Sequence, residues 1–327
     1  MAENHPLVTV IALCYNHEKF LLECLEGIHQ QTYQNIELII VDDASTDRSP
    51  QLIDEWLQRY NRKATFVKQT KNGGVCRSLN RALEYATGKY VAITATDDCW
   101  LPSKIQDQVK YFEPLPENVA VVYSDAFVMD EKGDLVADRF IKRFGRRDGF
   151  PQGTVFSCLV EGNFIPAMAT LVRRSSYEKV GPFDETLCYE DYDMWLRLAE
   201  RFDFAFCEKI GTKYRVVSNS LSQSFHSNRK IQLAKANYRI YEKCLTSRNL
   251  EPQLVPTVLE RIHFYAKVLH DERASSRHRA LLIALKHDFR IRTFLLLILS
   301  LCYIPVRVEK KLISLYQKLK NAKGAEA

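Results

Sequence analysis

Two adjacent carboxylates, Asp97 and Asp98, end an apolar run in the segment TATDDCWLP (94–102). Two like charges side by side at the end of a strand are costly unless a cation or hydrogen-bond donors compensate for them. Mg²⁺ and Mn²⁺ prefer oxygen ligands, and one or two carboxylates suffice when substrate phosphates and water complete the coordination. The pair therefore predicts a divalent-cation site that needs a phosphorylated ligand. The alternative is a turn that carries two solvated acids.

Polar side chains follow two other apolar runs as well. Tyr15 and Asn16 follow the first run, and Asp42 and Asp43 follow the second. A carboxylate at such a point can accept hydrogen bonds from the edge of a nucleotide base. It can also cap the next helix, which for Asp43 taken alone is the commoner role.

Arg77 lies near the start of a helix that Gly73 and Gly74 open. Helix N-termini and guanidinium groups both attract phosphate, although a lone helical Arg is more often a solvated surface charge. The chain has neither G-x-x-x-x-G-K-[ST] nor G-x-G-x-x-G, so the P-loop and dinucleotide-binding classes lack their motifs.

A third acidic segment, YEDYDMWLRLAERF (189–202), begins a predicted helix over 190–201. Asp191 falls in the first turn, where the helix dipole favours the ionised form. A carboxylate that faces a cleft can act as a general base. Asp193 and Arg197 are spaced to pair on a polar face. The alternative is that Glu190 and Asp191 only decorate a helix N-terminus.

The elements that must position these residues alternate in type. Continuous apolar runs suit strands buried on both faces, and the segments between them have helical periodicity. Ser45 or Thr46 is expected to cap the second helix. The pattern predicts a doubly wound α/β sheet, in which ligands bind at the carboxyl ends of the strands. The strands are predicted at 7–13, 36–41, 64–69 and 88–94, with helices at 18–31, after 46 and at 72–86.

From 104 to 226 the pattern becomes mixed and irregular. It predicts a helix at 103–113 and strands at 119–125, 169–174 and 214–217. From 227 onward the chain has helical patterns only. We therefore expect a domain at 1–226, divided near 103 into a nucleotide-binding half and an acceptor half, followed by a helical region at 227–327.

The composition indicates the cellular compartment of the protein. Nine cysteines without a C-x-x-C pair indicate free thiols in a reducing compartment. No basic residue precedes the first apolar run, so a secretory signal is not indicated. No uncharged apolar stretch reaches the roughly 20 residues that a membrane-spanning helix needs. These features predict a cytoplasmic protein.

The net charge of +6 comes from the tail, because residues 271–323 hold twelve Lys/Arg and four Asp/Glu. The segment RTFLLLILSLCYIPVR (292–307) is strongly apolar and has basic neighbours. Such a segment can lie on an anionic membrane surface, here the cytoplasmic face, or it can pack on the main domain. Nucleic acid is not an expected partner, since the tail has no RNA-binding motif.

Taken in order, these motifs resemble the family-2 glycosyltransferases of GT-A fold. The resemblance covers about 7–226. It rests on VIALCYNHEKFLLECLEGIHQQTY and IELIIVDDASTDRS, on NGGVCRSLNRALEYATGKYVAITATDDCWLPSKI, on GPFDETLCYEDYDMWLRLA, and on the closing YRVVSNSLS. It implies an inverting enzyme that moves a sugar from a nucleotide-diphospho-sugar to a saccharide or lipid-linked acceptor in cell-surface polysaccharide synthesis.

The resemblance also implies roles for the residues. Tyr15 and Asp43 would contact the base, with Asn16 nearby. Arg77 would lie near the base or diphosphate. Asp97 would face the ribose, Asp98 would bind Mg²⁺ or Mn²⁺, and Asp191 would be the catalytic base.

The chain departs from the family pattern at two places. The commoner L-D-x-D-D motif has Thr94 and Ala95 in its first two places, so its first acid is missing. A His that often follows Y-R-x is replaced by Val217. The departures keep a non-catalytic nucleotide-sugar-binding subunit open as an alternative. A nucleotidyltransferase is a second alternative, although LCYNHEKF lacks the Gly-rich, basic donor-phosphate loop of that class.

Overall fold

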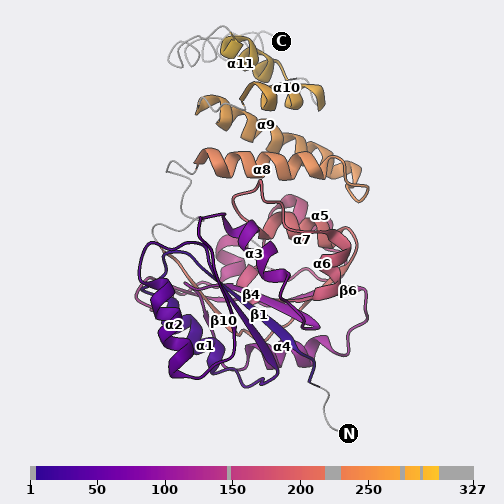
Figure 1. Ribbon diagram of the computed structural model, residues 1–327. Helices are drawn as coiled ribbons and strands as arrows, with labels where there is room; N and C mark the ends of the chain where they lie inside the picture. The colour runs from indigo at the N-terminus through magenta and orange to yellow at the C-terminus, as the bar shows by residue number, and fades with distance from the viewer. Residues whose placement is uncertain (1–4, 146–148, 218–229, 273–276, 288–289, 302–327) are drawn as a thin grey trace. The chain divides into compact units, whose positions relative to one another are not determined.

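The computed structural model describes residues 5–145, 149–217, 230–272, 277–287 and 290–301. The chain divides into two compact units, Met1–Gln223 and Ser224–Ala327. The first unit contains both sheets, and the described part of the second is helical (Figure 1).

A seven-stranded sheet forms the centre of the first unit, in the order β3-β2-β1-β4-β8-β6-β9. Strands β1 to β4 are parallel, whereas β8 runs antiparallel to both β4 and β6. The predicted doubly wound mixed sheet is therefore confirmed. The strands are β1 (Val8–Cys14), β2 (Ile36–Asp42), β3 (Thr65–Lys68), β4 (Tyr90–Ala95), β6 (Val119–Tyr123), β8 (Thr170–Arg173) and β9 (Asp203–Phe206).

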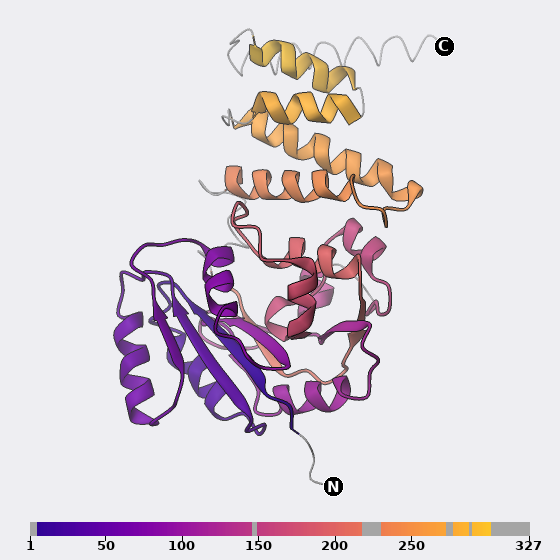
Figure 2. The same cartoon turned by 45° about the vertical axis from the view of Figure 1, so that its right-hand side comes forward.

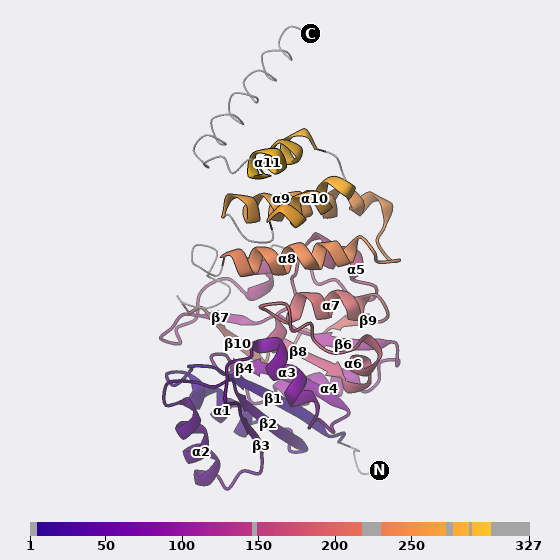
Figure 3. The same ribbon diagram turned by 45° about the horizontal axis from the view of Figure 1, so that its top comes forward.

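The strand order dictates where the first helices lie. The chain steps outward from β1 to β3 and then back across the sheet to β4. Because such crossovers are right-handed, α1 (Leu21–His29) and α2 (Ser49–Arg59) cover one face and α3 (Val75–Leu83) covers the other (Figure 3). The apolar side chains of α1, α2 and α4 (Lys104–Phe112) join one face of the sheet in a single core cluster.

The acceptor half and the segment just before it contain short elements that the sequence did not predict. These include β9, α5 (Phe156–Glu161), α6 (Arg174–Val180), and β5 and β7 of a small sheet in the order β5-β10-β7, whose strand β10 overlaps the predicted strand at 214–217. Elements of two to seven residues are too short to show a recognisable hydrophobic periodicity. The small sheet is built from β5 (Cys99–Trp100), β10 (Thr212–Arg215) and β7 (Phe127–Met129). The predicted acidic helix is α7 (Asp191–Ala199).

The predicted capping of the second helix is wrong. Helix α2 begins at Ser49, whose backbone N–H donates to Oδ1 of Asp47 at 2.9 Å. Ser45 instead donates its hydroxyl to Asp42 and accepts a hydrogen bond from the backbone N–H of Asn16. Ser45 therefore joins the ends of β1 and β2, because both strand ends leave polar backbone groups to satisfy.

The second unit contains α8 (Lys230–Cys244), α9 (Val255–Asp271), α10 (Arg277–His287) and α11 (Ile291–Leu301), each in contact with the next (Figure 2). The helical prediction is thus confirmed for its described residues. Within that same part of the chain, no helix combines the length and hydropathy that crossing a membrane requires. Residues 302–307 of the apolar segment and 218–222 of the closing loop lie outside the described residues.

Candidate functional site

The strand register gathers the predicted residues at one edge of the sheet. Cys14 pairs with Asp42, and Leu13 pairs with Ala95. The segments that follow β1, β2 and β4 therefore leave the sheet side by side. Strand β1 lies between β2 and β4, where the direction of winding reverses. Ligands of open α/β sheets bind at such a switch point.

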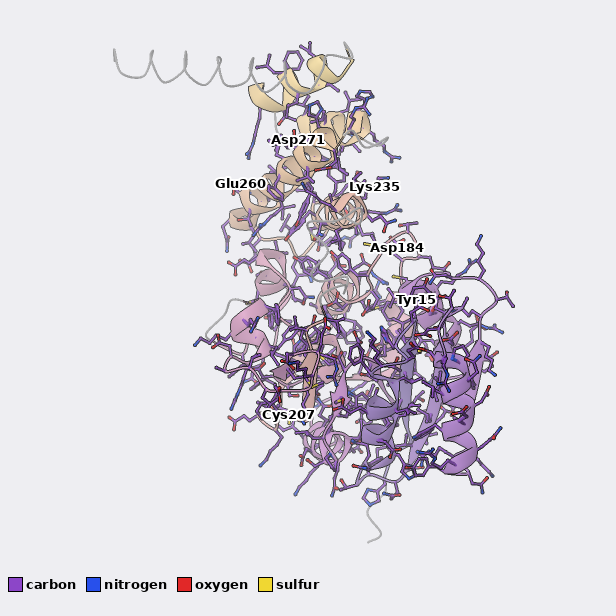
Figure 4. The ribbon with its side chains drawn as sticks, turned by 90° about the vertical axis from the view of Figure 1, so that its left-hand side faces the viewer. Tyr15, Asp184, Cys207, Lys235, Glu260 and Asp271 are labelled. Atoms are coloured by element: carbon purple, nitrogen blue, oxygen red, sulfur yellow. The ribbon has the colours of Figure 1, made fainter. Side chains whose placement is uncertain are left out.

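Tyr15 and Asn16 behave differently at this edge. Tyr15, which Figure 4 labels, has an exposed fraction of 40% and is open to a ligand. Asn16 has a positive φ of 57°, a conformation that Asn tolerates better than most residues. Its Oδ1 accepts a hydrogen bond from the backbone N–H of Thr46 at 2.8 Å. The amide of Asn16 thus fixes the loop after β2.

Asp43 is buried and holds the glycine turn. Its Oδ1 accepts hydrogen bonds from the backbone N–H of Gly73 at 2.8 Å and from Nε2 of Gln69 at 3.0 Å. Its Oδ2 accepts one from the backbone N–H of Gly74 at 2.9 Å. A carboxylate has about four acceptor positions, so Oδ2 retains one for a ligand. Asp43 therefore does not cap the next helix, α2, but holds the glycine turn that precedes α3.

Arg77 lies on the exposed side of α3. Its side chain is 62% exposed, and Nε is 3.7 Å from Oε2 of Glu185. An exposed pair of this length contributes little to stability. The guanidinium is therefore free to turn toward a phosphate without a large cost.

Asp97 and Asp98 face different surroundings. Asp98 is 4% exposed, and its Oδ1 accepts a hydrogen bond from the backbone N–H of Arg215 at 2.9 Å. Burial, and secondarily the charge of Asp97, raises the pKa of Asp98 well above its usual range. The side chain of Asp97 is more exposed, at 18%. Asp97 is thus the carboxylate that a ligand can reach more directly.

The sequence reasoning missed Arg215, which supports this acidic turn. Its side chain is 2% exposed, and its Nε donates to the backbone oxygen of Asp97 at 2.9 Å. It also pairs with Glu23 and donates to the backbone oxygen of Asp130. The sequence offered one signal, an Arg inside a predicted strand. Because an Arg is almost never fully buried unless it is paired, such a residue indicates a buried partner.

His17 was also missed. Its Nδ1 is 2.9 Å from Oγ1 of Thr96, and its Nε2 is 3.9 Å from Oδ2 of Asp97. The ring therefore lies directly beside the acidic turn. Among the described residues, no three His, Cys, Asp or Glu side chains gather into a preformed metal site.

Asp191 begins α7 and is held at both carboxylate oxygens. Nδ2 of Asn163 donates to its Oδ2 at 2.7 Å, and the backbone N–H of Tyr192 donates to its Oδ1 at 2.7 Å. Burial raises the pKa of Asp191, while these two hydrogen bonds oppose that rise. The pKa of Glu190 is raised to about 8, first by burial and then by the charge of Asp191. A carboxyl with a raised pKa is suited to proton transfer near neutral pH.

Helix α3 connects the glycine turn to the segment before Asp191. Nδ2 of Asn80 donates to the backbone oxygen of Phe183 at 3.0 Å, and the backbone N–H of Phe183 donates to Oδ1 of Asn80 at 2.8 Å. The Cys76 thiol lies 3.6 Å from the backbone oxygen of Tyr189. These contacts join the strand-end residues to the carboxylate on α7.

The predicted pairing of Asp193 with Arg197 is present, with Nε 2.8 Å from Oδ2. Its predicted place on a polar face is wrong, because Asp193 is buried. Arg197 also donates to the backbone oxygens of Val180 and Pro182. The pair therefore anchors the loop before α7. Asp193 is engaged in this pair, whereas Asp191 lies at the first position of the helix.

Comparison with known proteins identifies the family of the chain. The model of the family described as glycosyl transferase family 2 matches residues 9–181. An uncharacterized glycosyltransferase of Methanocaldococcus jannaschii is 28% identical over 64% of this chain and 71% of its own length. A Bacillus subtilis relative, TuaG, whose name assigns it to teichuronic acid biosynthesis, is 24% identical over 79% of this chain and 90% of its own. By contrast, the chain spans only 36% to 64% of the length of four Rickettsia relatives.

Solved structures show the same fold at low identity. A Pyrobaculum calidifontis mannosyltransferase, in complex with GDP-Man and Mn²⁺, aligns with a TM-score of 0.59 at 21% identity, over 92% of this chain and 81% of that one. S. aureus TarS, in complex with UDP-GlcNAc, aligns with a TM-score of 0.57 at 18% identity, over 92% and 82%.

Proposed function

Since the chain belongs to glycosyl transferase family 2, we propose that it moves a sugar from a nucleotide-diphospho-sugar to a hydroxyl group of a saccharide or lipid-linked acceptor, with inversion at the anomeric carbon. The observation that carries the proposal is the doubly hydrogen-bonded carboxylate of Asp191, connected through α3 to the turn that Asp43 holds. The name of TuaG supports a role in cell-surface polysaccharide synthesis, and the UDP-GlcNAc complex of TarS supports a nucleotide-sugar donor.

The donor would bind across the carboxyl ends of the first strands. Tyr15 offers an exposed ring for the base, and the remaining acceptor position of Asp43 suits an imide or amino group. Asn16 would position the loop rather than the base. Arg77 and the N-terminus of α3 would attract the diphosphate.

The acidic turn fits a divalent cation because it presents hard carboxylate oxygens beside each other. The sequence assigned the ribose to Asp97 and the ion to Asp98. We propose that these roles hold, because the backbone N–H of Arg215 engages only Oδ1 of Asp98 and leaves Oδ2 for Mg²⁺ or Mn²⁺. The ion, when bound, would stabilise the charge on the departing phosphate oxygens as a Lewis acid.

Asp191 acts as the general base in this proposal. Its carboxylate takes the proton of the acceptor hydroxyl, and the acceptor oxygen forms a bond to the anomeric carbon. The bond between that carbon and the phosphate oxygen breaks, and the nucleoside diphosphate leaves with the electron pair. Asn163 holds the carboxylate toward the acceptor throughout.

The decisive experiment incubates the protein and Mn²⁺ with a panel of UDP-, GDP- and dTDP-sugars and measures release of the nucleoside diphosphate. We expect turnover with at least one donor, and its loss in Asp191→Asn. Binding of a donor without turnover, with and without acceptor extracts, would favour the non-catalytic subunit. Release of pyrophosphate from a nucleoside triphosphate and a sugar phosphate would favour a nucleotidyltransferase.

We propose in addition that the enzyme is cytoplasmic and attaches to anionic membrane through its basic C-terminal region. Phe264, Leu282 and Phe294 are exposed on the helices of the second unit, and residues 271–323 carry the excess of Lys and Arg. Apolar side chains beside basic ones favour an anionic lipid surface. In a flotation assay with phosphatidylglycerol vesicles, the full chain should rise with the vesicles, whereas a fragment of residues 1–270 should not. Equal flotation of both proteins would contradict the proposal.

A further inference from the structure

The second unit contains a cavity between α9 and the beginning of α11. Its volume is about 490 Å³, which is within the roughly 300 to 1,000 Å³ of small-molecule sites. His263 and Thr293 line its inner part, since both are buried, and Nδ1 of His263 lies 2.7 Å from Oγ1 of Thr293. This contact joins α9 to α11 and so holds the cavity in a defined shape.

Positive charge predominates around this cavity. Arg261, Lys267 and Arg290 line it, whereas Glu260 is the one acid that lines it among the described residues. Lys267 also pairs with Asp271, which Figure 4 labels together with Glu260. Three cations therefore face two acids even when Asp271 is counted. The cavity consequently favours an anion.

The first turn of α11 adds hydrogen-bond donors. The helix begins at Ile291, and the backbone oxygen of Arg290 accepts a hydrogen bond from the backbone N–H of Phe294 at 3.0 Å. The N–H groups that precede Phe294 have no acceptor within the helix. Because Arg290 and Thr293 line the cavity, this end of the helix borders it. Helix N-termini bind phosphate, and a planar guanidinium group matches a phosphate with two parallel hydrogen bonds.

Large apolar side chains are exposed at the same place. Phe264 lines the cavity and is 54% exposed, and Phe294, which follows the lining residue Thr293, is 40% exposed. Exposed apolar side chains beside basic ones suit a lipid surface better than water. The ligand that fits both features has an anionic headgroup and an apolar chain.

We propose that this cavity binds the phosphate monoester headgroup of a membrane lipid, with Arg261, Arg290 and the first turn of α11 as donors and Phe264 against the lipid chain. A phosphate monoester carries a charge of about −1.5 to −2 near pH 7 and three acceptor oxygens, which a phosphodiester does not. The inference rests on the membrane attachment proposed above, because that membrane supplies the lipid. It adds a single site with a preferred headgroup to an attachment that needs only negative charge.

The test is flotation of the full chain with two kinds of phosphatidylcholine vesicle, one containing phosphatidic acid and the other phosphatidylglycerol. The two are matched in electrophoretic mobility, so that they differ in headgroup and not in surface charge. The readout is the ratio of the two affinities, because loss of any cation weakens binding to both. The wild-type chain should bind phosphatidic acid about 10-fold more tightly or better, as expected for charged hydrogen bonds.

Four variants locate the site. Arg261→Gln and Arg290→Gln should each abolish most of the preference. Lys235→Gln is the matched control, because it removes the same charge from the exposed side of α8 and should keep the preference. Glu260→Gln should increase the preference, since it removes the acid that lines the cavity. Circular dichroism verifies that each variant keeps its helices.

The outcomes separate the inference from the proposed attachment. If the wild-type chain shows no preference, or if Lys235→Gln lowers the preference as much as Arg261→Gln does, the cavity is not the site and the attachment stands. Glycerol 3-phosphate should compete only weakly, because it lacks a chain to contact Phe264. Competition as strong as that of phosphatidic acid would make a free phosphate ester the ligand and overturn the lipid assignment. If the chain floats with neither vesicle, the attachment and this inference both fail.

Discussion

Nδ2 of Asn163 donates a 2.7 Å hydrogen bond to Oδ2 of Asp191 across 28 positions of sequence. The orientation of that amide is fixed, because Oδ1 of Asn163 accepts a hydrogen bond from the backbone N–H of Ile165 at 3.1 Å. The NH₂ group must therefore face the carboxylate. Asn163 thus stabilises the ionised form of Asp191 against the burial that raises its pKa.

Asn163→Ala should shift the acidic limb of the pH profile of kcat/KM to higher pH. The hydrogen bond lowers the pKa of Asp191, so its loss lets burial raise the pKa further. Steady-state rates across pH 5 to 9 test the shift. A uniform loss of rate with an unchanged profile would show that Asn163 acts on folding alone, and Asn163→Asp should not restore the profile because it adds a like charge.

Asp191→Asn should lower kcat by about 100- to 10,000-fold, the usual contribution of general base catalysis. Affinity for the nucleoside diphosphate should change little, because Asp191 is proposed to contact the acceptor and not the donor. Asp54→Asn is a control on the surface of the first unit, where Asp54 pairs only with exposed Lys68. Turnover assays and calorimetry give the two quantities, and near-normal turnover of Asp191→Asn would remove it as the base.

Glu190 should make the first unit less stable as the pH rises. Its pKa is about 8 in the folded state against an ordinary 4.5, so the folded state binds the proton more tightly than the unfolded chain. Its stabilising contribution is complete below pH 4.5 and is lost as the pH rises through about 8. Glu190→Gln should flatten this dependence, and urea unfolding at pH 5, 7 and 9 would show it. An unchanged slope would contradict the raised pKa.

Arg215→Met should destabilise the first unit by about 3 kcal/mol, because it leaves the backbone oxygen of Asp97 without its donor and removes one of two donors to the backbone oxygen of Asp130. Glu23→Gln should cost less than about 1 kcal/mol, since Glu23 is half exposed. The measurement is tryptophan fluorescence in urea, because Trp56, Trp100 and Trp195 all belong to the first unit. Equal losses in the two variants would mean that the ion pair, not the backbone contacts, dominates.

The sequence predicted the residues whose signal is local. β1 could be predicted because it is buried on both faces, and Asp191 because an acid at a helix start is visible in the sequence. Arg215 could not be placed, since its contact with Asp98 joins positions 117 apart. Asn163 was missed because its contact with Asp191 joins positions 28 apart, and because its neighbours along the chain form no periodic pattern. Short elements such as β5 depend on pairing partners that the sequence does not reveal.

The reciprocal hydrogen bonds between Asn80 and Phe183 give the enzyme a stiff mechanical coupling. Helix α3, which we propose to contact the diphosphate, and the loop that leads to Asp191 cannot move apart without breaking both hydrogen bonds. We therefore expect donor binding near α3 to shift the loop before Asp191 slightly. This coupling predicts that binding of the donor changes the affinity for the acceptor.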